Sequence, residues 1–126
     1  MATAVFPAHR AIYLGALRQA RRISERIADA TSAPEEMPHE ARYFITDDFR
    51  SGFGVTHDGT FIGLFSLVKG RGGDLVEAAI TQGGRKLDCF DGFLPDYYRQ
   101  FGFVETERVA NWTAGEPDVV FMAIPF

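Results

Sequence analysis

The stretch of sequence that decides the fold is LDCFDGFLPDYYRQFGF, residues 87–103. It begins with residues typical of a short strand and ends in a segment with the signals of a short helix. Pro95 suits the first turn of a helix, and Gly102 suits the left-handed position just past its end. Apolar and aromatic side chains recur between them at helical spacing: Phe93, Tyr97 and Phe101 on one stripe, Leu94 and Tyr98 on the next. The stretch therefore predicts a strand, a loop and a helix of about one and a half turns.

The aromatic helix has two interpretations. An aromatic stripe by itself usually serves packing in a protein core. In the other interpretation, the segment resembles the last conserved block of the GCN5-related N-acetyltransferases. In that family a strand leads through a loop to a helix reading aromatic-Tyr-x-x-x-Gly-Phe, and here Tyr98 is followed after three residues by Gly102-Phe103. The resemblance places Tyr98 where the tyrosine of that family reaches the sulfur of the acyl-thioester cofactor. It implies a small, divergent member of the superfamily, with Tyr98 as general acid for the thiolate.

Length and composition fit a small globular domain. The 126 residues and 14.0 kDa allow one compact domain with a core, but they fall below the usual size of the acetyltransferases that the chain resembles. We therefore expect a single domain over residues 1–126, trimmed at the N-terminus. A hydrophobic fraction of 46% and 12 phenylalanines indicate a folded protein.

Charge and cysteine usage restrict the partners and the compartment. The formal net charge of −4 disfavours binding to nucleic acid or anionic membranes, which attract clustered Lys and Arg. One segment departs from this balance, and its arginines form either a solvated helix face or a basic docking surface: Arg10, Arg18, Arg21, Arg22 and Arg26. No apolar run approaches the roughly 20 residues that cross a bilayer, residues 1–6 lack the features of a signal peptide, and the lone Cys89 cannot form an internal disulfide. We expect a cytoplasmic protein without a membrane partner.

The periodicity along the chain predicts the order of the elements. Residues 1–40 predict one long amphipathic helix at about 7–30 and a proline-containing loop or broken helix at 31–38, with no clear first strand. Residues 41–126 predict strands at 42–45, 52–55 and 61–68, a helix from about 75, a strand at 85–90, the tyrosine helix, and strands at 103–108 and 118–124. This order predicts an α/β fold with a mixed, mostly antiparallel central sheet flanked by helices.

A glycine-rich turn lies between the third of these strands and the next helix. It occupies the place of the Arg/Gln-x-x-Gly-x-Gly/Ala turn of the family, whose backbone N–H groups hold the pyrophosphate of coenzyme A. The resemblance implies acetyl-CoA as cofactor, bound by residues Leu67, Val68, Lys69, Gly70, Arg71, Gly72 and Gly73. The turn looks compressed, because a single arginine separates its glycines, and Asp74 adds a negative charge at the helix start. A tight turn without a ligand is the alternative.

Acyl transfer to an amine needs a polarised carbonyl, a neutral amine and a proton for the departing thiolate. The resemblance implies polarisation by a backbone N–H near the end of the third strand, at residues 67–69, and proton donation by Tyr98. No glutamate lies on that strand, where many relatives carry a base. Asp88 and Asp91 are the available carboxylates, although capping a loop is the commoner role for such residues.

Asn111 and Trp112 lie on the long connection between the last two strands. We expect them to border the acceptor site, because exposed loops with a large aromatic residue commonly recognise ligands. A Trp112 folded back as a lid on the core is the alternative. His9, His39 and His57 are scattered along the chain, and their spacing predicts no metal site.

Three functions remain open. The first is an acetyl-CoA-dependent N-acetyltransferase whose acceptor is a small-molecule, protein or nucleobase amine. The second is a catalytically inactive binding or regulatory module with the same fold. The third is a nucleobase-modifying relative of the phage type. The arginine-rich helix favours this function, because it could contact nucleic acid, whereas the negative net charge disfavours it. A homodimer is compatible with each.

Overall fold

A computed structural model describes residues 3–125, and the chain forms two compact units, Met1–Gly84 and Arg85–Phe126. The first unit contains β1 (Phe6–Ala8), α1 (Arg10–Ile23), α2 (Glu25–Ala30), the 3₁₀ helix η1 (Pro34–Glu36), β2 (Ala41–Ile45), β3 (Ser51–Thr56), β4 (Phe61–Ser66) and α3 (Gly72–Thr81). The second contains β5 (Lys86–Phe90), α4 (Phe93–Arg99), β6 (Val104–Val109) and β7 (Val119–Ala123). The single domain expected over residues 1–126 stays a prediction.

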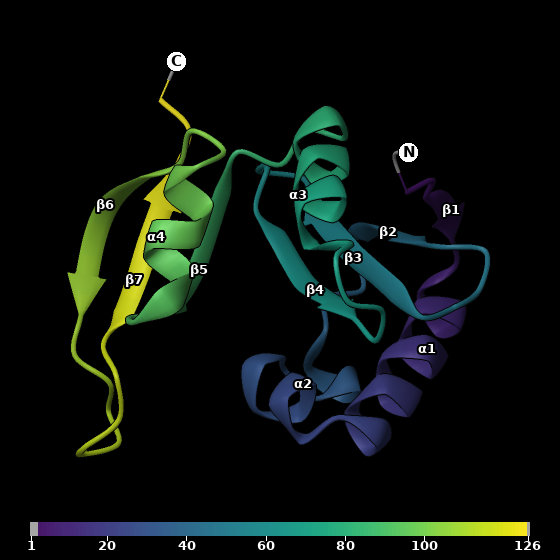
Figure 1. The fold of residues 1–126 in the computed structure, drawn as a ribbon, viewed down its shortest axis with the longest axis horizontal. Helices are drawn as coiled ribbons and strands as arrows, with labels where there is room; N and C mark the ends of the chain where they lie inside the picture. Colours follow the sequence, from purple (N-terminus) through teal and green to yellow (C-terminus); the bar gives the residue numbers. More distant parts are fainter. Residues whose placement is uncertain (1–2, 126) are drawn as a thin grey trace. The chain divides into compact units, whose positions relative to one another are not determined.

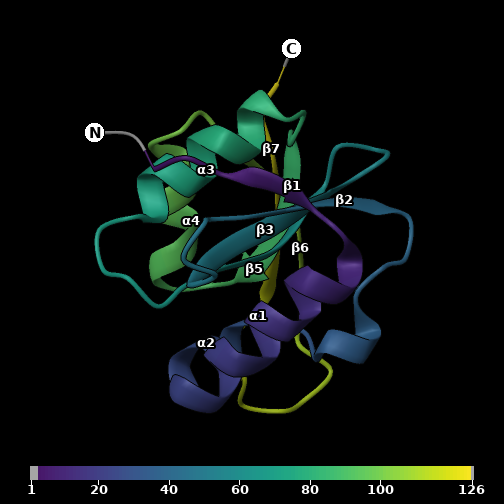
Figure 2. The same cartoon turned by 90° about the vertical axis from the view of Figure 1, so that its right-hand side faces the viewer.

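The first unit is built on an antiparallel sheet with the strand order β1-β2-β3-β4. Figure 2 shows α1 and α2 on one face of this sheet and α3 on the other. Both faces of β3 are therefore covered, and its residues Ser51–Val55 are buried. The three strands predicted before the glycine turn are confirmed, although the third ends earlier, at Ser66. The predicted hairpin between β3 and β4 is confirmed too, with Gly59 at φ 85 in its turn.

A bulge interrupts β4 in its middle. Phe53 of β3 lies opposite two residues of β4, Gly63 and Leu64, because the pairing register shifts there by one residue. Gly63 has φ 56, and a Cβ at this position would lie 2.1 Å from Tyr13 Oη. The Tyr13 hydroxyl donates to the Gly63 carbonyl oxygen over 2.5 Å. The bulge therefore requires glycine, both for its backbone conformation and for space.

Tyr13 also centres the core between α1 and the sheet. Its ring is completely buried, stacks on Tyr43 with centroids 4.5 Å apart, and meets the edge of Phe65 at 5.8 Å. The other side chains that α1 buries are Leu14, Ala16, Leu17 and Ala20. This apolar face fixes α1 on the sheet, as the helical periodicity predicted.

Two features near the N-terminus differ from the sequence-based expectations. The single long helix over residues 7–30 is wrong, because the backbone of Ser24 is extended and separates α1 from α2. The Ser24 hydroxyl accepts from the Ile27 N–H at 3.2 Å, so a serine that can cap a new helix ends the preceding one. A first strand, for which the sequence shows no clear sign, is present as the three-residue β1 paired with β2.

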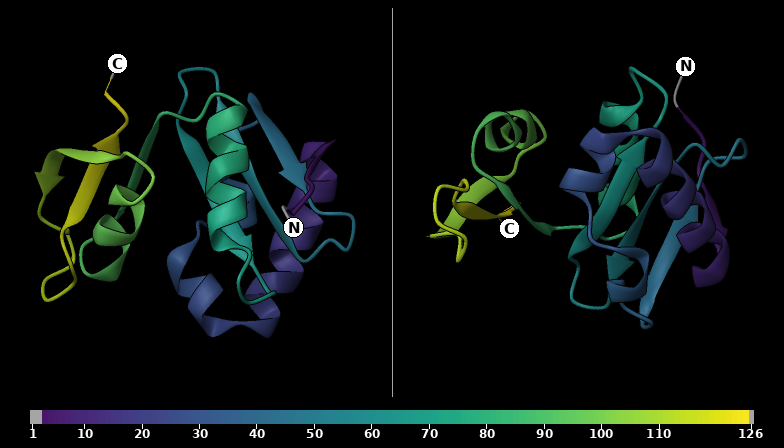
Figure 3. Two further views of the ribbon diagram at one scale, coloured as in Figure 1. Left: turned by 45° about the horizontal axis from the view of Figure 1, so that its top comes forward. Right: turned by 90° about the horizontal axis from the view of Figure 1, so that it is seen from below.

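The second unit is a sheet of order β5-β7-β6 with α4 packed on it (Figures 1 and 3). The predicted strand, tyrosine helix and closing strands are confirmed. The predicted class, α/β with mostly antiparallel strands and flanking helices, is confirmed as well. The strands form two hydrogen-bonded sheets rather than one mixed sheet, β1-β2-β3-β4 in the first unit and β5-β7-β6 in the second. Every pairing in residues 3–125 is antiparallel.

Candidate functional site

The glycine turn joins the end of β4 to the start of α3. Gly70 has φ 88, a conformation that residues with side chains rarely adopt, and Arg71 is the N-cap of α3. The first intrahelical hydrogen bond is donated by the Leu75 N–H to the Arg71 carbonyl oxygen over 3.0 Å. The N–H groups of residues 72–74 precede this bond and donate to no acceptor in the described part of the chain. The turn therefore presents orphan donors and the positive end of a helix dipole, which together suit an anion.

Arg71 forms a two-pronged ion pair with Asp48, which lies on the turn between β2 and β3. Its Nη2 is 2.7 Å from Asp48 Oδ2, and its Nη1 is 3.1 Å from Asp48 Oδ1. Asp48 Oδ1 also accepts from the Thr46 hydroxyl at 2.6 Å and from the Arg50 N–H at 3.0 Å. These hydrogen bonds hold the pKa of Asp48 well below its ordinary value, and the hydrogen bond from Arg71 has the largest effect. The carboxylate in turn raises the pKa of Arg71, so the pair stays ionised across the neutral range.

Two serines connect this ion pair to the end of β4. Arg71 Nη1 donates to Ser51 Oγ at 3.2 Å, and Ser51, which is completely buried, lies 2.9 Å from Ser66 Oγ. Ser66 Oγ donates to the Val68 carbonyl oxygen at 2.7 Å and accepts from the Val68 N–H at 3.1 Å. A continuous polar chain thus runs from Asp48 through Arg71 to Val68.

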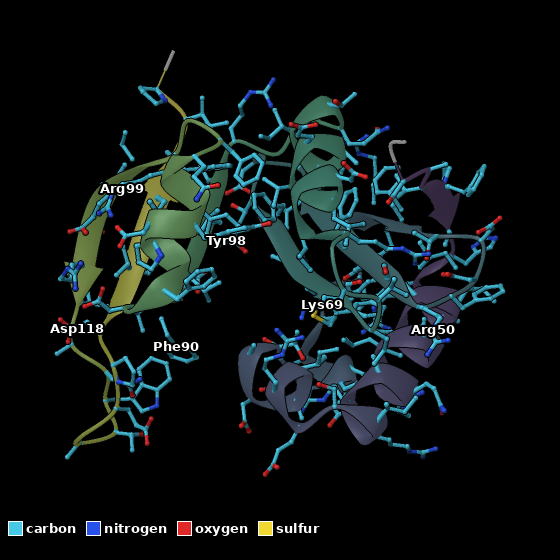
Figure 4. All side chains as sticks on the ribbon, in the orientation of Figure 1. Arg50, Lys69, Phe90, Tyr98, Arg99 and Asp118 are labelled. Atoms are coloured by element: carbon cyan, nitrogen blue, oxygen red, sulfur yellow. The ribbon has the colours of Figure 1, made fainter. Side chains whose placement is uncertain are left out.

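This chain decides which backbone donors are available near the end of β4. The Val68 N–H is taken by Ser66, and the Leu67 N–H donates to the Arg50 carbonyl oxygen at 2.8 Å. Of the three N–H groups expected to polarise a carbonyl, only that of Lys69 has no acceptor among residues 3–125. Lys69 itself is exposed on the turn (Figure 4).

Asp74, whose charge weakened the prediction of an anion site, is held by the N-terminal segment. Its Oδ2 accepts from the Thr3 N–H at 2.9 Å and from the Thr3 hydroxyl at 3.1 Å. These two hydrogen bonds engage one carboxylate oxygen of Asp74. The negative charge therefore remains at the helix start, but part of it is directed toward Thr3.

A groove of about 550 Å³ lies between α1 and the turn after β2. Three half-exposed apolar side chains line it, those of Ile12, Ile23 and Phe49, and Leu67 belongs to its wall. Phe49 has φ 60, the single positive φ outside glycine among the described residues. No pattern in the sequence indicates this groove, and of the residues assigned to the cofactor only Leu67 contributes to it.

Tyr98 lies on α4 in the second unit (Figure 4). It is 8% exposed, and its ring meets the edges of Phe103 at 6.0 Å and Tyr97 at 5.5 Å. Burial raises the pKa of the Tyr98 phenol above its ordinary value, and the neighbouring Cys89 and Tyr97 add smaller effects in the same direction. The phenol is therefore protonated at neutral pH, the form that a general acid needs. Tyr97 is less buried and stacks on Phe93 at 5.6 Å.

The two candidate bases differ in their surroundings. Asp91 Oδ2 lies 2.6 Å from Arg108 Nη1, and the hydrogen bond from Arg108 lowers the pKa of Asp91. Arg108 also pairs with Glu105 at 2.9 Å. A lowered pKa makes a carboxylate a weaker base, which disfavours Asp91 as the base, and the assignment of a base to either carboxylate stays a prediction. Asp88 is exposed on β5, while burial raises the pKa of the adjacent Cys89 to about 11 and keeps it a thiol.

The loop between β6 and β7 presents Trp112 to solvent. Trp112 is 90% exposed, so the alternative of a lid folded on the core is wrong. The Asn111 side chain organises the loop: its Nδ2 donates to the Pro117 carbonyl oxygen at 3.1 Å, and its Oδ1 accepts from the Thr113 N–H at 2.9 Å. The contact of both residues with an acceptor stays a prediction.

Two arginines of the basic segment serve the fold. Arg21 Nη1 caps the end of α2 through the carbonyl oxygens of Ala28 at 3.0 Å and Thr31 at 2.5 Å. Arg10 Nη2 donates to the Met37 carbonyl oxygen at 2.8 Å.

Within residues 3–125, no three His, Cys, Asp or Glu side chains gather as metal ligands would. The helices of this part of the chain include none with the length and apolar character needed to cross a bilayer.

Solved structures define the class of fold. The chain is similar to an acyl-CoA N-acyltransferase from Pseudomonas aeruginosa, with a TM-score of 0.67 and 18% identity over 96% of this chain and 99% of the other. It is also similar to a candidate N-acetyltransferase from Lactobacillus plantarum, with a TM-score of 0.60 and 20% identity over 98% of both chains. By sequence, it matches no protein-family model and no curated protein. The protein has the acyl-CoA N-acyltransferase fold, which confirms at the level of fold the resemblance to the GCN5-related N-acetyltransferases.

The start of α3 locates the glycine turn within the chain. Because α3 begins at Gly72, the family pattern counted from that glycine runs from Lys69 to Asp74. Gly72 is the one position that matches in this count, since lysine stands in place of Arg/Gln and aspartate in place of Gly/Ala. The turn therefore still departs from the family pattern. Asp48 was not among the expected site residues, because its sequence neighbours indicate only a turn.

Proposed function

We propose that the protein transfers an acetyl group from acetyl-CoA to an amine. The fold supports acyl-CoA-dependent chemistry in general. The observation that carries the proposal is the set of orphan N–H groups of residues 72–74, at the start of the helix that follows β4. Backbone donors at a helix start bind phosphate oxygens without any side chain.

The residues of the turn fit the pyrophosphate of coenzyme A. The donors of Gly72 and Gly73 approach it without a side chain in the way, and the exposed Lys69 adds a positive charge. Arg71 is committed to Asp48, so the backbone carries the larger share of this contact. The cofactor supplies a thioester, whose carbonyl carbon an amine can attack.

Two groups of the chain would assist the transfer. The Lys69 N–H is the remaining backbone donor for polarising the carbonyl, since those of Leu67 and Val68 are occupied. Tyr98 would donate its phenolic proton as charge develops on the sulfur. Burial keeps the phenol protonated but also makes it a weaker acid, so the resemblance of the tyrosine block, and not the pKa, supports this assignment.

Asp88 is the stronger candidate for the base. It would accept a proton from the amine, directly or through water, while the ion pair with Arg108 weakens Asp91 in that role. Asn111 and Trp112 are proposed to border the acceptor, and the exposed indole of Trp112 is free to meet a ligand.

One observation favours a second function, an inactive module that binds but does not turn over. Two backbone donors that could polarise a carbonyl are already paired, those of Leu67 and Val68. Asp74 also retains a charge beside the anion site. Such a module would bind an acyl-CoA without transferring its acyl group.

The release of free thiol from acetyl-CoA tests the proposal. The protein is incubated with acetyl-CoA and a panel of amines that includes polyamines, aminoglycosides, amino acids, lysine peptides and nucleobases. We expect amine-dependent thiol release together with an acetylated product in the mass spectrum. Binding of acetyl-CoA without transfer to any amine would establish the inactive module instead.

A further inference from the structure

The proposed function assigns no role to the two-pronged ion pair between Arg71 and Asp48. We propose that Asp48 is a positioning residue, which holds Arg71 and through it the glycine turn in the shape that binds a pyrophosphate. In this arrangement the guanidinium acts on the turn rather than on the phosphates. The inference rests on the proposed function of the same turn.

The contacts of Arg71 point inward, to the protein. Both terminal nitrogens lie on the carboxylate of Asp48, and Nη1 also reaches the buried hydroxyl of Ser51. The side chain of Arg71 is 23% exposed and that of Asp48 34%. A two-pronged guanidinium–carboxylate contact fixes direction as well as distance. A single point charge aimed at a ligand would not need this geometry.

Asp48 is itself held in place before any ligand arrives. Its Oδ1 accepts from the Thr46 hydroxyl and the Arg50 N–H, and Thr46 is buried at the end of β2. The acceptor for Arg71 is therefore held by two further hydrogen bonds within the turn between β2 and β3. Because Arg71 is the N-cap of α3, restricting its position restricts the start of that helix.

The other end of the glycine turn is held by the serines. Ser51 and Ser66 link the guanidinium to both backbone polar groups of Val68. The turn is thus held at Val68 and at Arg71, with Gly70 between them. A binding loop that is ordered in advance binds more tightly, since its ordering does not reduce the free energy of binding.

The binding of coenzyme A and of S-acetylpantetheine, which lacks the pyrophosphate, tests this inference. Titration calorimetry compares the wild type with Asp48→Asn and Arg71→Lys, and Asp47→Asn removes the same charge one residue away as the matched control. We expect Asp48→Asn and Arg71→Lys each to weaken coenzyme A by about fivefold, the upper end for a partly exposed ion pair. Lysine keeps the charge but cannot form the two-pronged contact. The affinity for S-acetylpantetheine and the behaviour of Asp47→Asn should match the wild type.

Three results would overturn the inference while leaving the proposed function intact. Tighter binding of coenzyme A by Asp48→Asn would mean that Asp48 competes with the phosphates for Arg71. Normal binding by Arg71→Lys would mean that only the charge matters. An equal loss for both ligands would mean general damage to the fold. A wild type that binds neither ligand would instead remove the proposed function, and this inference with it.

Discussion

At the scale of single residues, the neighbouring Tyr98 and Tyr97 differ in burial and in the rings that they contact. They are adjacent on α4, but Tyr98 is buried against Phe103 while Tyr97 stacks on the exposed Phe93. The resemblance to the tyrosine block of the GCN5-related N-acetyltransferases implies Tyr98 as the general acid. The raised pKa of Tyr98 keeps the phenol protonated but makes it a weaker acid, so the effect of removing its hydroxyl on turnover decides the assignment.

Replacing Tyr98 by phenylalanine keeps the ring and removes the hydroxyl. We expect Tyr98→Phe to retain its affinity for acetyl-CoA while turnover falls by roughly a hundredfold, within the range for general acids. Steady-state kinetics of thiol release give both quantities. Tyr97→Phe is the matched control and should turn over as the wild type does. An active Tyr98→Phe, or a damaged Tyr97→Phe, would show that the register of the tyrosine helix is misassigned.

At the scale of elements, the periodicity predicted most helices and strands because each of them buries one face. It could not predict the ion pair between Asp48 and Arg71, which are 23 residues apart and meet because of how β3 and β4 are paired. The break at Ser24 carried a local signal, a serine able to cap a helix, but the apolar stripe continues across it and concealed it. The bulge at Gly63 had no local sequence signal, because a glycine within a strand is compatible with a bulge, a bend or the close approach of another backbone.

The bulge gives a prediction for stability. We expect Gly63→Ala to lower the free energy of unfolding by about 3 kcal/mol, from the strained backbone and from the displaced Tyr13 hydroxyl. Chemical denaturation measures this change. Gly70→Ala is the matched control: its φ of 88 is also left-handed, but no atom lies within 4 Å of the added Cβ. It should therefore lower stability by only about 1 kcal/mol. Equal effects at the two positions would contradict the assigned role of Tyr13.

At the scale of the whole molecule, carboxylates held by arginines predict sensitivity to acid. The pKa values of Asp48, Asp91 and Glu105 are lowered in the folded state, by Arg71 for the first and by Arg108 for the other two. Their contribution is complete above the unfolded value, about 4 for such groups, and is lost as the pH falls through the folded values. We expect the free energy of unfolding to decrease below about pH 4. Asp48→Asn should be less stable at neutral pH and should show a smaller decrease; a decrease like that of the wild type would contradict the role of the ion pair.

The binding of acetyl-CoA to the wild-type protein tests the central claim most directly. Titration calorimetry and thermal unfolding are measured on the same sample over increasing cofactor concentration. A ligand that binds only the folded state raises the melting temperature, and the rise continues as its concentration exceeds the dissociation constant. We expect one cofactor to bind each chain, with a heat of binding and a concentration-dependent increase in melting temperature. No heat and an unchanged melting temperature at millimolar acetyl-CoA would contradict the assignment of the glycine turn as a cofactor site.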